Sequence, residues 1–383
     1  MNSSKTVDDL NSQRNLGFMF HKSNDHNKAA QCFIDNIENN PNKDKIYFDF
    51  LCLATVLNKI NTKLSATIIE WVFIKRPELK FAYEHLPKSL VSEVSLYANT
   101  IARDFKYNEQ LTELKLLANS SDNRARLFDF LEAFHGLKQP EYGDVMQKPS
   151  YHVYPKLKAL AFHPLSDFPW VELVENKFDD IKHELLQLYS NKSSIKPYIK
   201  EANTGNSGLD TLANSLNWSS IHLIQGGEYR DELLKQCPVL SSVLKALPLP
   251  ALSGNAPEAF LSVLKPKTAI LPHYGLSNIK LTVHLGIDIP QDCAIRVGNE
   301  THTWKQGKLM IFDDSFEHEA WNKSNENRIV FIFEIWHPEL SSIEIEGIQT
   351  IMKLQNEFNQ SAQMCGADSL LQEVKNVCKN NGK

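Results

Sequence analysis

The sequence predicts an α+β protein built from two parts, a helical N-terminal half and a β-rich C-terminal half. Its 383 residues are enough to bury two moderate cores. Apolar residues recur with helical spacing through roughly the first 145 residues, whereas from Trp218 onward they alternate in short runs. We therefore expect an α-helical domain over residues 1–148, a β-rich domain over 149–345 and a helical tail over 346–383.

The clearest helical signal lies near the N-terminus and matches the tetratricopeptide pattern at the right offsets. The matching residues are Leu16, Gly17, Phe20, Ala29, Phe33 and Pro41. Gly17 and Ala29 would let two helices approach closely. Phe20 and Phe33 would then fill the seam between them. Later helical segments show no clean second copy, so we expect an irregular tetratricopeptide-like domain. A helical bundle that matches the motif by chance is the alternative.

The helical spacing breaks between Gly143 and Tyr154, where Gly and Pro cluster. One more amphipathic helix follows over residues 171–189, and a loop covers 204–208. Beyond it the chain carries short β-like runs separated by turn residues, namely IHLIQ, AFLSVL, TAILPH, KLTVHLGIDI, AIRVG, KLMIFDD and RIVFIFEIW. Many short strands at this spacing favour an antiparallel barrel or a double-sheet jelly roll.

The composition excludes several classes of protein. A net charge of −5 without any basic block argues against a nucleic-acid partner. The six cysteines are scattered without a CxxC pair, which argues against a disulfide framework or a zinc knuckle and favours a reducing compartment. The polar start predicts no signal peptide, and no apolar run reaches the roughly 18 residues of a transmembrane helix. We expect a soluble, cytoplasmic protein.

Histidines concentrate in the β-rich half, and two of them have the setting of metal ligands. His273 ends the run TAILPH, and His318 follows another apolar run 45 residues later. Antiparallel strands would bring the two imidazoles together, and Gly275 stands where a carboxylate ligand could follow the first. Such a site suits iron(II) that must also hold a bidentate cosubstrate and dioxygen. Taken singly, either histidine could instead be a core or surface residue whose ring makes ordinary hydrogen bonds.

The motifs around these histidines carry a resemblance to a known family. The segments PHYGLSN, HLGIDIP, NETHTWKQGKLMIFDDSFEHEAW and RIVFIFEIWHPEL resemble the aspartyl/asparaginyl β-hydroxylase family. The close match covers Phe260 to Leu340, and a fainter one begins near Tyr154. Members of that family are oxygenases on a double-stranded β-helix. The resemblance therefore implies that fold, an Fe(II) centre, 2-oxoglutarate as cosubstrate and dioxygen as the oxidant.

The resemblance also implies roles for individual residues. It assigns the metal to His273 and His318, and the family shares the missing carboxylate at Gly275. It assigns the distal carboxylate of 2-oxoglutarate to Arg328, for which a guanidinium is suited because it binds carboxylates in a bidentate manner. Further cosubstrate contacts fall to Ser262 and His284, and Trp218 lies beside the active-site mouth. For Ser262 and Trp218, ordinary strand packing is the alternative interpretation.

Substrate binding is where this chain departs from its family. Alternation along the strand puts Lys280, Thr282 and His284 on one face. The animal protein hydroxylases have arginines at the positions of Lys280 and Thr282, which grip an acidic side chain, and a lysine at that of Phe260. Of these three positions, only Lys280 carries a positive charge in this chain. The threonine at position 282 cannot replace a guanidinium.

The resemblance predicts a hydroxylase of an amino-acid side chain, Asp- or Asn-like, in a protein or peptide. Concave faces of helical repeats bind extended segments, so we expect the helical domain to dock that substrate. Two alternatives stay open. One is a hydroxylase of a free amino acid or a lipid, and the other is a non-catalytic adaptor in which the helical domain binds a partner.

The remaining polar and aromatic residues of this stretch are predicted to be structural. Asp313 or Asp314 should bind turn amides or a group next to the metal ligands, without being a ligand. His302 and His337 are also predicted to be structural. Trp304, Trp321 and Trp336 are expected to pack within the barrel rather than to form a binding site.

Overall fold

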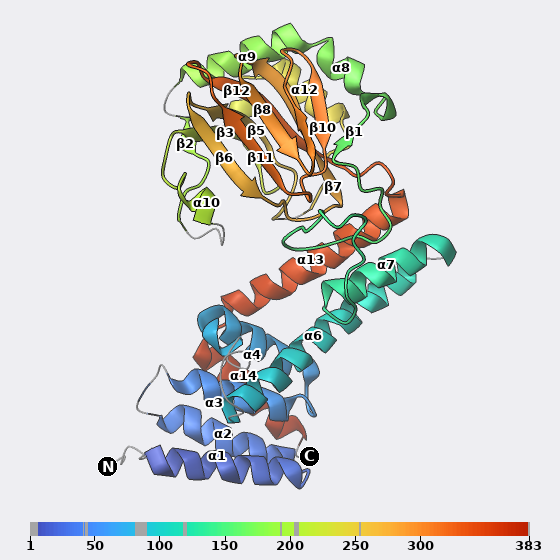
Figure 1. Ribbon diagram of the computed structural model, residues 1–383. Coiled ribbons are helices and arrows are strands. Elements are labelled where there is room, and N and C mark those ends of the chain that lie inside the picture. Colours follow the sequence, from blue (N-terminus) through green and yellow to red (C-terminus); the bar gives the residue numbers. More distant parts are fainter. Residues whose placement is uncertain are drawn as a thin grey trace. The chain divides into compact units, whose positions relative to one another are not determined.

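The computed structural model describes residues 7–40, 42, 45–80, 90–117, 121–191, 194–202, 207–252 and 254–381 (Figure 1). The chain forms two compact units, Met1–Glu113 with Lys353–Lys383, and Leu114–Met352. The protein is thus a mixed helix-and-sheet protein whose N-terminal part is helical and whose sheets lie in the C-terminal part, as predicted.

The first unit is helical. Its helices are α1 (Val7–Lys22), α2 (His26–Asn39), α3 (Ile46–Leu57), α4 (Thr62–Lys75), most of α6 (Leu90–Leu117), the end of α13 (Ser342–Met364) and α14 (Ala367–Asn381). Side-chain caps begin two of them, because Asp25 accepts a hydrogen bond from the Lys28 amide and Asn61 accepts one from the Leu64 amide. Apolar faces of α2, α3 and α4 form one core with residues of α6, α13 and α14.

The predicted close approach of two N-terminal helices is present between α1 and α2. A Cβ added at Gly17 would lie 2.9 Å from the Phe33 ring, and Ala29 is fully buried. The ring that meets Phe33 edge-on, at 5.2 Å between centroids, is that of Phe18 rather than the predicted Phe20. The sixth motif position, Pro41, lies outside the described residues. A tetratricopeptide-like repeat therefore stays a prediction.

The second unit begins with helix and continues into sheet. Helix α7 (Ser121–Phe134) packs against the start of α13, where a Cβ at Gly347 would lie 2.6 Å from the Leu127 side chain. The Tyr154 hydroxyl donates a hydrogen bond to Glu344 of α13. These contacts place α7 and the first residues of α13 with the sheets, so the compact units divide the chain at other positions than the predicted residues 148 and 345.

Two antiparallel sheets form the body of this unit. The larger has the order β1-β10-β7-β12-β5-β3-β2, with β4 paired to β3, and the smaller has the order β6-β11-β8-β9. The larger sheet comprises β1 (Phe162–His163), β2 (Lys196–Pro197), β3 (Trp218–Gln225), β4 (Glu228–Tyr229), β5 (Ala259–Leu264), β7 (Lys280–Asp288), β10 (Leu309–Phe312) and β12 (Arg328–Trp336). The smaller comprises β6 (Thr268–His273), β8 (Cys293–Val297), β9 (Glu300–His302) and β11 (His318–Asn322).

Most of these strands were predicted, three of them residue for residue. The runs AFLSVL, TAILPH and RIVFIFEIW are β5, β6 and β12. Strand β11 was not predicted as a strand, because FEHEAW is too charged to alternate clearly. The helix predicted over residues 171–189 is two helices, α8 (Val171–Glu175) and α9 (Phe178–Ser190).

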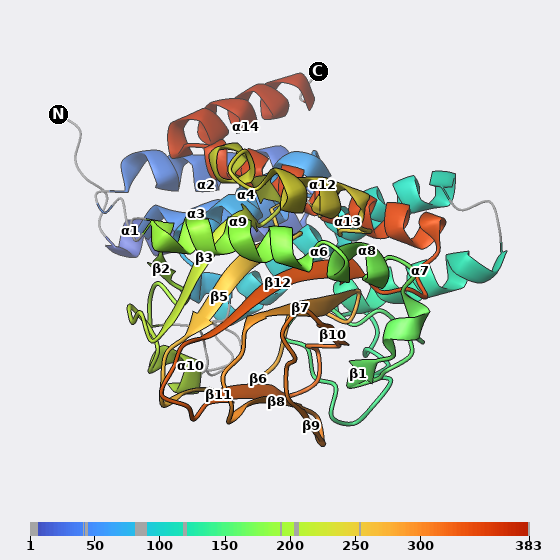
Figure 2. The same ribbon diagram turned by 90° about the horizontal axis from the view of Figure 1, so that it is seen from above.

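Helices cover the outer face of the larger sheet (Figure 2). Leu281, Val283 and Leu285 of β7 point into a core shared with α9 and with α12 (Pro238–Ala246). The alternate residues of β7 point the other way, toward the smaller sheet, where a second core lies. Both faces of the larger sheet are therefore buried. The short elements η2 (Leu165–Asp167), α10 (Ser207–Asp210) and α11 (Asp231–Leu234) complete the unit.

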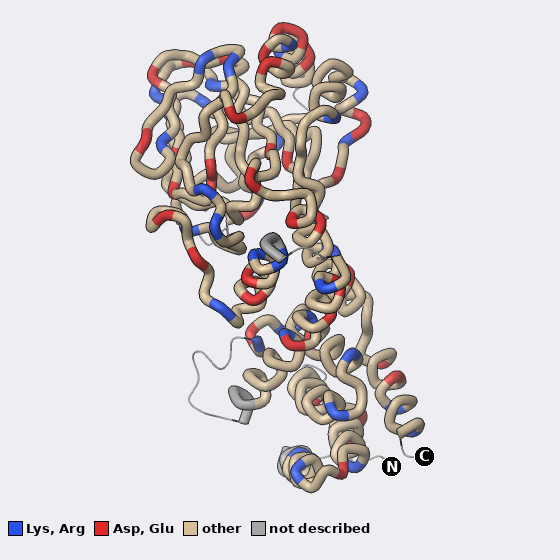
Figure 3. The backbone as a smooth tube through the Cα atoms, turned by 90° about the vertical axis from the view of Figure 1, so that its right-hand side faces the viewer, with Lys and Arg blue, Asp and Glu red and all other residues tan. Residues whose placement is uncertain are grey.

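Charges of both signs are spread over the described backbone. Lys and Arg are interspersed with Asp and Glu along the tube of Figure 3. Within the part of the chain that is described, no helix combines the length and the apolar character needed to cross a membrane.

Truncating a residue of the core beneath the helices should weaken the sheet unit without touching its inner face. Phe331 of β12 is 1% exposed and belongs to that core. We expect Phe331→Ala to lower the free energy of unfolding by about 3–5 kcal/mol, because it leaves a cavity that the sheet cannot close. Urea unfolding monitored by tryptophan fluorescence measures this loss. Tyr229→Ala, at a side chain that is 53% exposed, should change stability by less than about 1 kcal/mol.

Candidate active site

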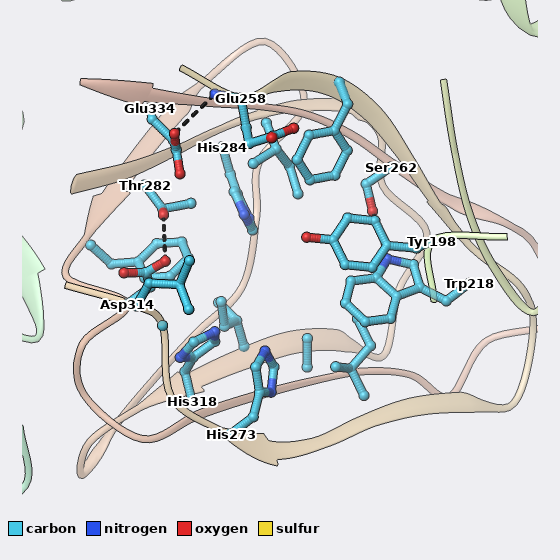
Figure 4. Close-up of a pocket in the computed structure, with 18 of the residues that line it drawn as sticks. Tyr198, Trp218, Glu258, Ser262, His273, Thr282, His284, Asp314, His318 and Glu334 are labelled. Carbon is cyan, nitrogen blue, oxygen red and sulfur yellow. Dashed lines mark hydrogen bonds between the residues drawn. The ribbon is translucent and has the colours of Figure 1, made fainter. Parts of the chain in front are cut away.

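A cavity of about 480 Å³ lies between the two sheets (Figure 4). Its lining comes from β3, β5, β7, β10 and β12 of the larger sheet and from β6, β8 and β11 of the smaller. All eight residues that the sequence nominated line it, namely Trp218, Ser262, His273, Lys280, Thr282, His284, His318 and Arg328. The tertiary structure thus gathers into one place residues that span 110 positions of the chain.

The two nominated metal ligands face each other across a strand pair. His273, the last residue of β6, and His318, the first of β11, are direct register partners, and their ring centroids lie 4.1 Å apart. The Nδ1 of His273 lies 2.8 Å from the Leu271 carbonyl oxygen, and that of His318 lies 3.0 Å from the Phe316 carbonyl oxygen. A carbonyl only accepts, so each Nδ1 carries the proton and each Nε2 keeps a free lone pair.

Burial keeps both imidazoles neutral. It lowers the pKa of His273 to about 4, with a smaller contribution from His318, and it also lowers the pKa of His318. Two neutral imidazoles with free Nε2 atoms can supply two ligands to a transition metal. Over the described residues, no group of three or more His, Cys, Asp or Glu side chains is placed to share a metal ion.

Gly275 is required by its neighbour Asp314. A Cβ at position 275 would lie 2.4 Å from the Asp314 carboxyl group, and the Gly275 amide donates a 2.7 Å hydrogen bond to the Asp314 carbonyl oxygen. One carboxylate oxygen of Asp314 accepts a hydrogen bond from Thr282, 3.1 Å away. The other is buried without a hydrogen-bond partner. The carboxylate therefore fills the space that a side chain at position 275 would need.

The guanidinium of Arg328 is buried, and no carboxylate of the described residues forms an ion pair with it. The residue is 1% exposed, its Nε makes no hydrogen bond, and its guanidinium carbon lies 5.0 Å from the centre of the Trp304 ring. Burial lowers the pKa of Arg328 to about 10. Burying a charge costs several kcal/mol unless an anion or hydrogen bonds compensate, and the aromatic face compensates only in part. The site is suited to an anion.

Ser262 and His284 lie on strands adjacent to Arg328. Ser262, paired with Val330 two residues along β12, accepts a 3.2 Å hydrogen bond from the Trp218 indole nitrogen. The Nδ1 of His284 accepts a 3.0 Å hydrogen bond from the Trp304 indole nitrogen. Since an indole nitrogen only donates, His284 carries its proton on Nε2, which leaves one donor for a ligand. Burial, and then Arg328, lower the pKa of His284.

Lys280 is not free to bind a substrate by itself. Its Nζ forms an ion pair with the Glu334 carboxylate, and both side chains are about one-tenth exposed. Burial opposes the lysine charge, but Glu334 and Asp314 outweigh burial and raise the pKa of Lys280. Glu258 lies beside this pair, and its amide donates to Glu334. Burial, reinforced by Glu334, raises the pKa of Glu258 to about 7.

Residues for which the sequence predicted structural roles make contacts within the protein. Asp313 is 1% exposed and binds the Ser315 amide and hydroxyl and the Gln147 side chain. His337 is buried beside the Lys158 carbonyl oxygen, and His302 stacks on Phe162. The prediction for Trp304 was incomplete, because its ring lines the cavity beneath Arg328 and orients His284.

Sequence reasoning missed a group of cavity residues whose positions only the fold brings together. These are Tyr198, His222, Glu258 and Glu334. Tyr198 stacks on Trp218 at 4.0 Å between centroids, and its hydroxyl points into the cavity (Figure 4). Glu334 could have been found from the sequence, since it alternates with Arg328 and Ile332 along β12. Tyr198 and His222 belong to segments without a recognised motif.

Sequence comparison finds a similarity between the segment that carries the site and a known family. Residues 175–338 match the family model described as aspartyl/asparaginyl beta-hydroxylase. The predicted resemblance to that family is confirmed over these residues. The β-hydroxylase-like segment includes every residue nominated for the site. The N-terminal segment that was predicted to be tetratricopeptide-like lies outside it.

Curated relatives with hydroxylase names align with the same half of the chain. The human aspartyl/asparaginyl beta-hydroxylase is 32% identical over 210 residues, 54% of this chain and 26% of that protein. The aspartate beta-hydroxylase domain-containing protein 2 of Xenopus tropicalis is 30% identical over 54% of this chain and 55% of its own length. The ornithine lipid ester-linked acyl 2-hydroxylase of Rhizobium tropici is 28% identical over 48% of this chain and 63% of its own. The chain thus spans about a quarter to two-thirds of the length of these relatives.

Likeness to solved structures is weaker. A Pseudomonas putida prolyl-4-hydroxylase aligns over 44% of this chain and 100% of its own, at 12% identity and a TM-score of 0.28.

A side chain at position 275 should destabilise the protein because it would collide with Asp314. We expect Gly275→Ala to lower the free energy of unfolding by about 1–3 kcal/mol, because the new methyl group collides with that carboxylate. Asp314→Ala should relieve the collision, so the double variant should be more stable than the sum of the two single losses by about 1 kcal/mol or more. Urea unfolding of the four proteins measures this coupling. Additive losses would contradict it, and Gly366→Ala, whose Cβ meets only a 3.7 Å contact, is the matched control.

Proposed function

We propose that this protein is an Fe(II)- and 2-oxoglutarate-dependent dioxygenase that hydroxylates an amino-acid side chain in a protein or peptide. The single observation that carries the proposal is the buried guanidinium of Arg328, whose Nε makes no hydrogen bond, in the same cavity as His273 and His318. A metal cation and a dianionic ligand would each satisfy groups that the protein alone leaves unsatisfied.

The donor set fits iron(II). His273 and His318 would hold the metal through Nε2, with their Nδ1 protons bound to carbonyl oxygens that orient both rings. Two protein ligands leave positions for a bidentate cosubstrate and dioxygen. When bound, iron(II), 2-oxoglutarate and dioxygen supply the oxidising power for hydroxylation of a C–H bond.

The other residues would hold the cosubstrate and exclude water. Arg328 would bind the distal carboxylate of 2-oxoglutarate in a bidentate manner, and Ser262 would donate a hydrogen bond to the same group. His284 would donate from Nε2 to another oxygen of that cosubstrate. Trp218 and Tyr198 close one side of the cavity with stacked rings, which would keep water from the metal. Substrate would contact Lys280 and Thr282.

The arrangement of the sheets supports the double-stranded β-helix implied by the family. Two antiparallel sheets enclose the cavity, and each supplies one part of the site. The smaller sheet carries both histidines, and the larger carries Arg328, Ser262 and His284. Because the two sheets are rigid, residues on opposite sheets can hold a metal and its cosubstrate at fixed distances.

The substrate of the proposed enzyme is a protein or peptide with an Asp- or Asn-like target. The name of the human relative, an aspartyl/asparaginyl hydroxylase, supports this choice. The helical unit, with its tetratricopeptide-like first helices, would dock the substrate or a second protein. A cytoplasmic location accompanies this proposal, since the six cysteines are all free thiols.

A hydroxylase of a lipid is the second candidate. The similarity to an ornithine lipid ester-linked acyl 2-hydroxylase favours it. Succinate formation stimulated by acyl lipids in vesicles, but by no peptide, would select this candidate over the first.

Removing one imidazole should abolish metal binding while the fold remains. We expect His318→Ala to weaken binding of iron(II), measured by anaerobic titration calorimetry, by at least about 100-fold, because a two-residue site loses half its protein ligands. Iron-dependent succinate formation from 2-oxoglutarate should vanish with it. His302→Ala is the matched control, since that ring stacks on Phe162 outside the cavity. Unchanged iron affinity in His318→Ala would remove the metal assignment.

Truncating Arg328 should weaken the binding of 2-oxoglutarate and leave the binding of iron(II) nearly unchanged. We expect Arg328→Ala to raise the dissociation constant of 2-oxoglutarate by roughly 30- to 1,000-fold, because a charge-assisted bidentate pair contributes about 2–4 kcal/mol. Iron(II) affinity should change less than about threefold. Arg328→Lys should recover part of the loss, since it restores the charge without the fork. Arg296→Ala, which breaks ion pairs with Glu317 and Glu319 outside the cavity, is the control. An unchanged 2-oxoglutarate affinity would contradict the assignment.

A further inference from the structure

A second cavity, of about 470 Å³, adjoins the cavity of the candidate active site. It is lined by residues of β2 and β3, by Lys200 beyond β2, and by Arg230 with the first residues of α11. Since β2 is the last strand of the larger sheet (Figure 1), we call this space the edge cavity. His222 and Gln225 line both cavities, so the two cavities share part of one wall.

The edge cavity lies on the same face of the larger sheet as the active-site cavity. Lys196 of β2 is the register partner of Ser220 of β3, and paired residues project to the same face of a sheet. Ser220 alternates along β3 with Trp218 and His222, which line the active-site cavity. Tyr198, two residues after Lys196, lines that cavity as well. This face therefore leads from one cavity to the other.

Three cations line the edge cavity. Lys196, Lys200 and Arg230 are exposed, and none of the three forms an ion pair with a described residue. Arg230 donates a 2.6 Å hydrogen bond to the side-chain oxygen of Gln225, which holds the guanidinium against the wall that both cavities share. All three cations are therefore available to a ligand.

The carboxylates of the edge cavity do not balance these cations. They are Asp231 and Glu232 at the start of α11, and Glu232 pairs with Lys235, which lies outside the edge cavity. Three positive side chains thus face one uncommitted carboxylate. Because the side chains are exposed, a single ion pair here would be weak, and a ligand gains most where it contacts more than one cation.

The positive charge reaches the shared wall. Burial is the main reason why the pKa of His222 falls to about 4, and Arg230 and then Lys200 lower this pKa further. Both cations therefore lie within electrostatic reach of the ring that lines the two cavities. The ring itself is neutral at pH 7.

The active-site cavity has no uncommitted cation for an acidic group of a substrate. Its described lining contains one lysine and one arginine, Lys280 and Arg328. Lys280 is in a buried ion pair with Glu334, and Arg328 is the residue assigned to the cosubstrate. The edge cavity supplies the cations that this lining lacks.

We propose that the edge cavity binds an acidic side chain, Asp or Glu, that lies near the target residue in the sequence of a peptide substrate. This inference rests on the proposed function, because it adds a second binding site for the same substrate. Lys196, Lys200 and Arg230 would hold the carboxylate through charge-assisted hydrogen bonds. The peptide between the two residues would follow the face of β3 that carries His222. The same cations would also attract an acidic peptide during association.

The test places one glutamate at different distances from the target residue. N-acetylated, C-amidated peptides of about nine residues, about 30 Å long when extended, carry Asn at the centre of a Gly-Ser background and Glu at each other position in turn. The full chain is loaded with iron(II) and 2-oxoglutarate under nitrogen, so that no turnover occurs, and binding is measured by titration calorimetry. We expect Glu at one position, or at two neighbouring ones, to tighten binding by at least about fivefold over the peptide without Glu. Lys at the same position should weaken binding.

The double variant Lys196→Gln/Lys200→Gln tests the cations that carry the inference. It removes two charges from exposed side chains, so the gain from Glu should disappear. The affinities for the peptide without Glu and for 2-oxoglutarate should stay constant. The double variant Lys177→Gln/Lys245→Gln is the matched control, since it removes the same charge from exposed positions outside both cavities and should keep the gain.

The outcomes separate the two proposals. An equal gain at every position, no gain at any position, no binding of any peptide at millimolar concentration, or a gain that persists in Lys196→Gln/Lys200→Gln would each overturn the acidic-residue proposal. Binding to phosphatidylglycerol vesicles that this variant loses, without a preference among the peptides, would assign the edge cavity to a lipid phosphate instead. If iron(II) and 2-oxoglutarate bind normally in those cases, the dioxygenase proposal stands. Failure of both to bind to the wild-type protein would overturn the proposed function, whichever peptide binds.

Discussion

The candidate site depends on the pairing of β6 with β11. Because His273 and His318 are register partners, the hydrogen bonds between the two strands set the distance between the imidazoles. A shift of one residue in either strand would turn one ring to the opposite face. The carbonyl oxygens that fix the ring tautomers come from Leu271 and Phe316, each two residues before its histidine, so the same local geometry also exposes both Nε2 atoms.

The opposite wall of the cavity holds groups that are costly unless a ligand is bound. Within the described part of the chain, the Nε of Arg328 has no acceptor, and one carboxylate oxygen each of Glu258 and Asp314 has no donor. A protein under selection for stability alone would pair or replace such groups, because each unsatisfied buried polar atom costs about 1–3 kcal/mol.

The hydrophobic core between the larger sheet and its covering helices offsets the cost of these unsatisfied groups. One face of β7 and β12 packs beneath α9 and α12 through residues such as Val283 and Phe331. The other face of the same strands carries Lys280, Thr282, His284 and Arg328. Strand alternation thus assigns stability to one side of the larger sheet and the candidate chemistry to the other. Burial of both faces explains why β12 is apolar at every position except Arg328, its first residue, and Glu334.

The sequence by itself determined the helical and sheet halves and the strands β5, β6 and β12, because periodicity is a local property. Its resemblance to a family then nominated eight of the residues that line the cavity. The sequence did not determine that α7 packs against the start of α13, since that contact joins positions more than 200 residues apart. It also did not determine that Glu258, Asp314 and Glu334 line the same cavity, because only the sheet order brings their segments together. Lys280 is the plainest case: in the sequence it is a free cation on a polar face, and tertiary structure decides that Glu334 neutralises it.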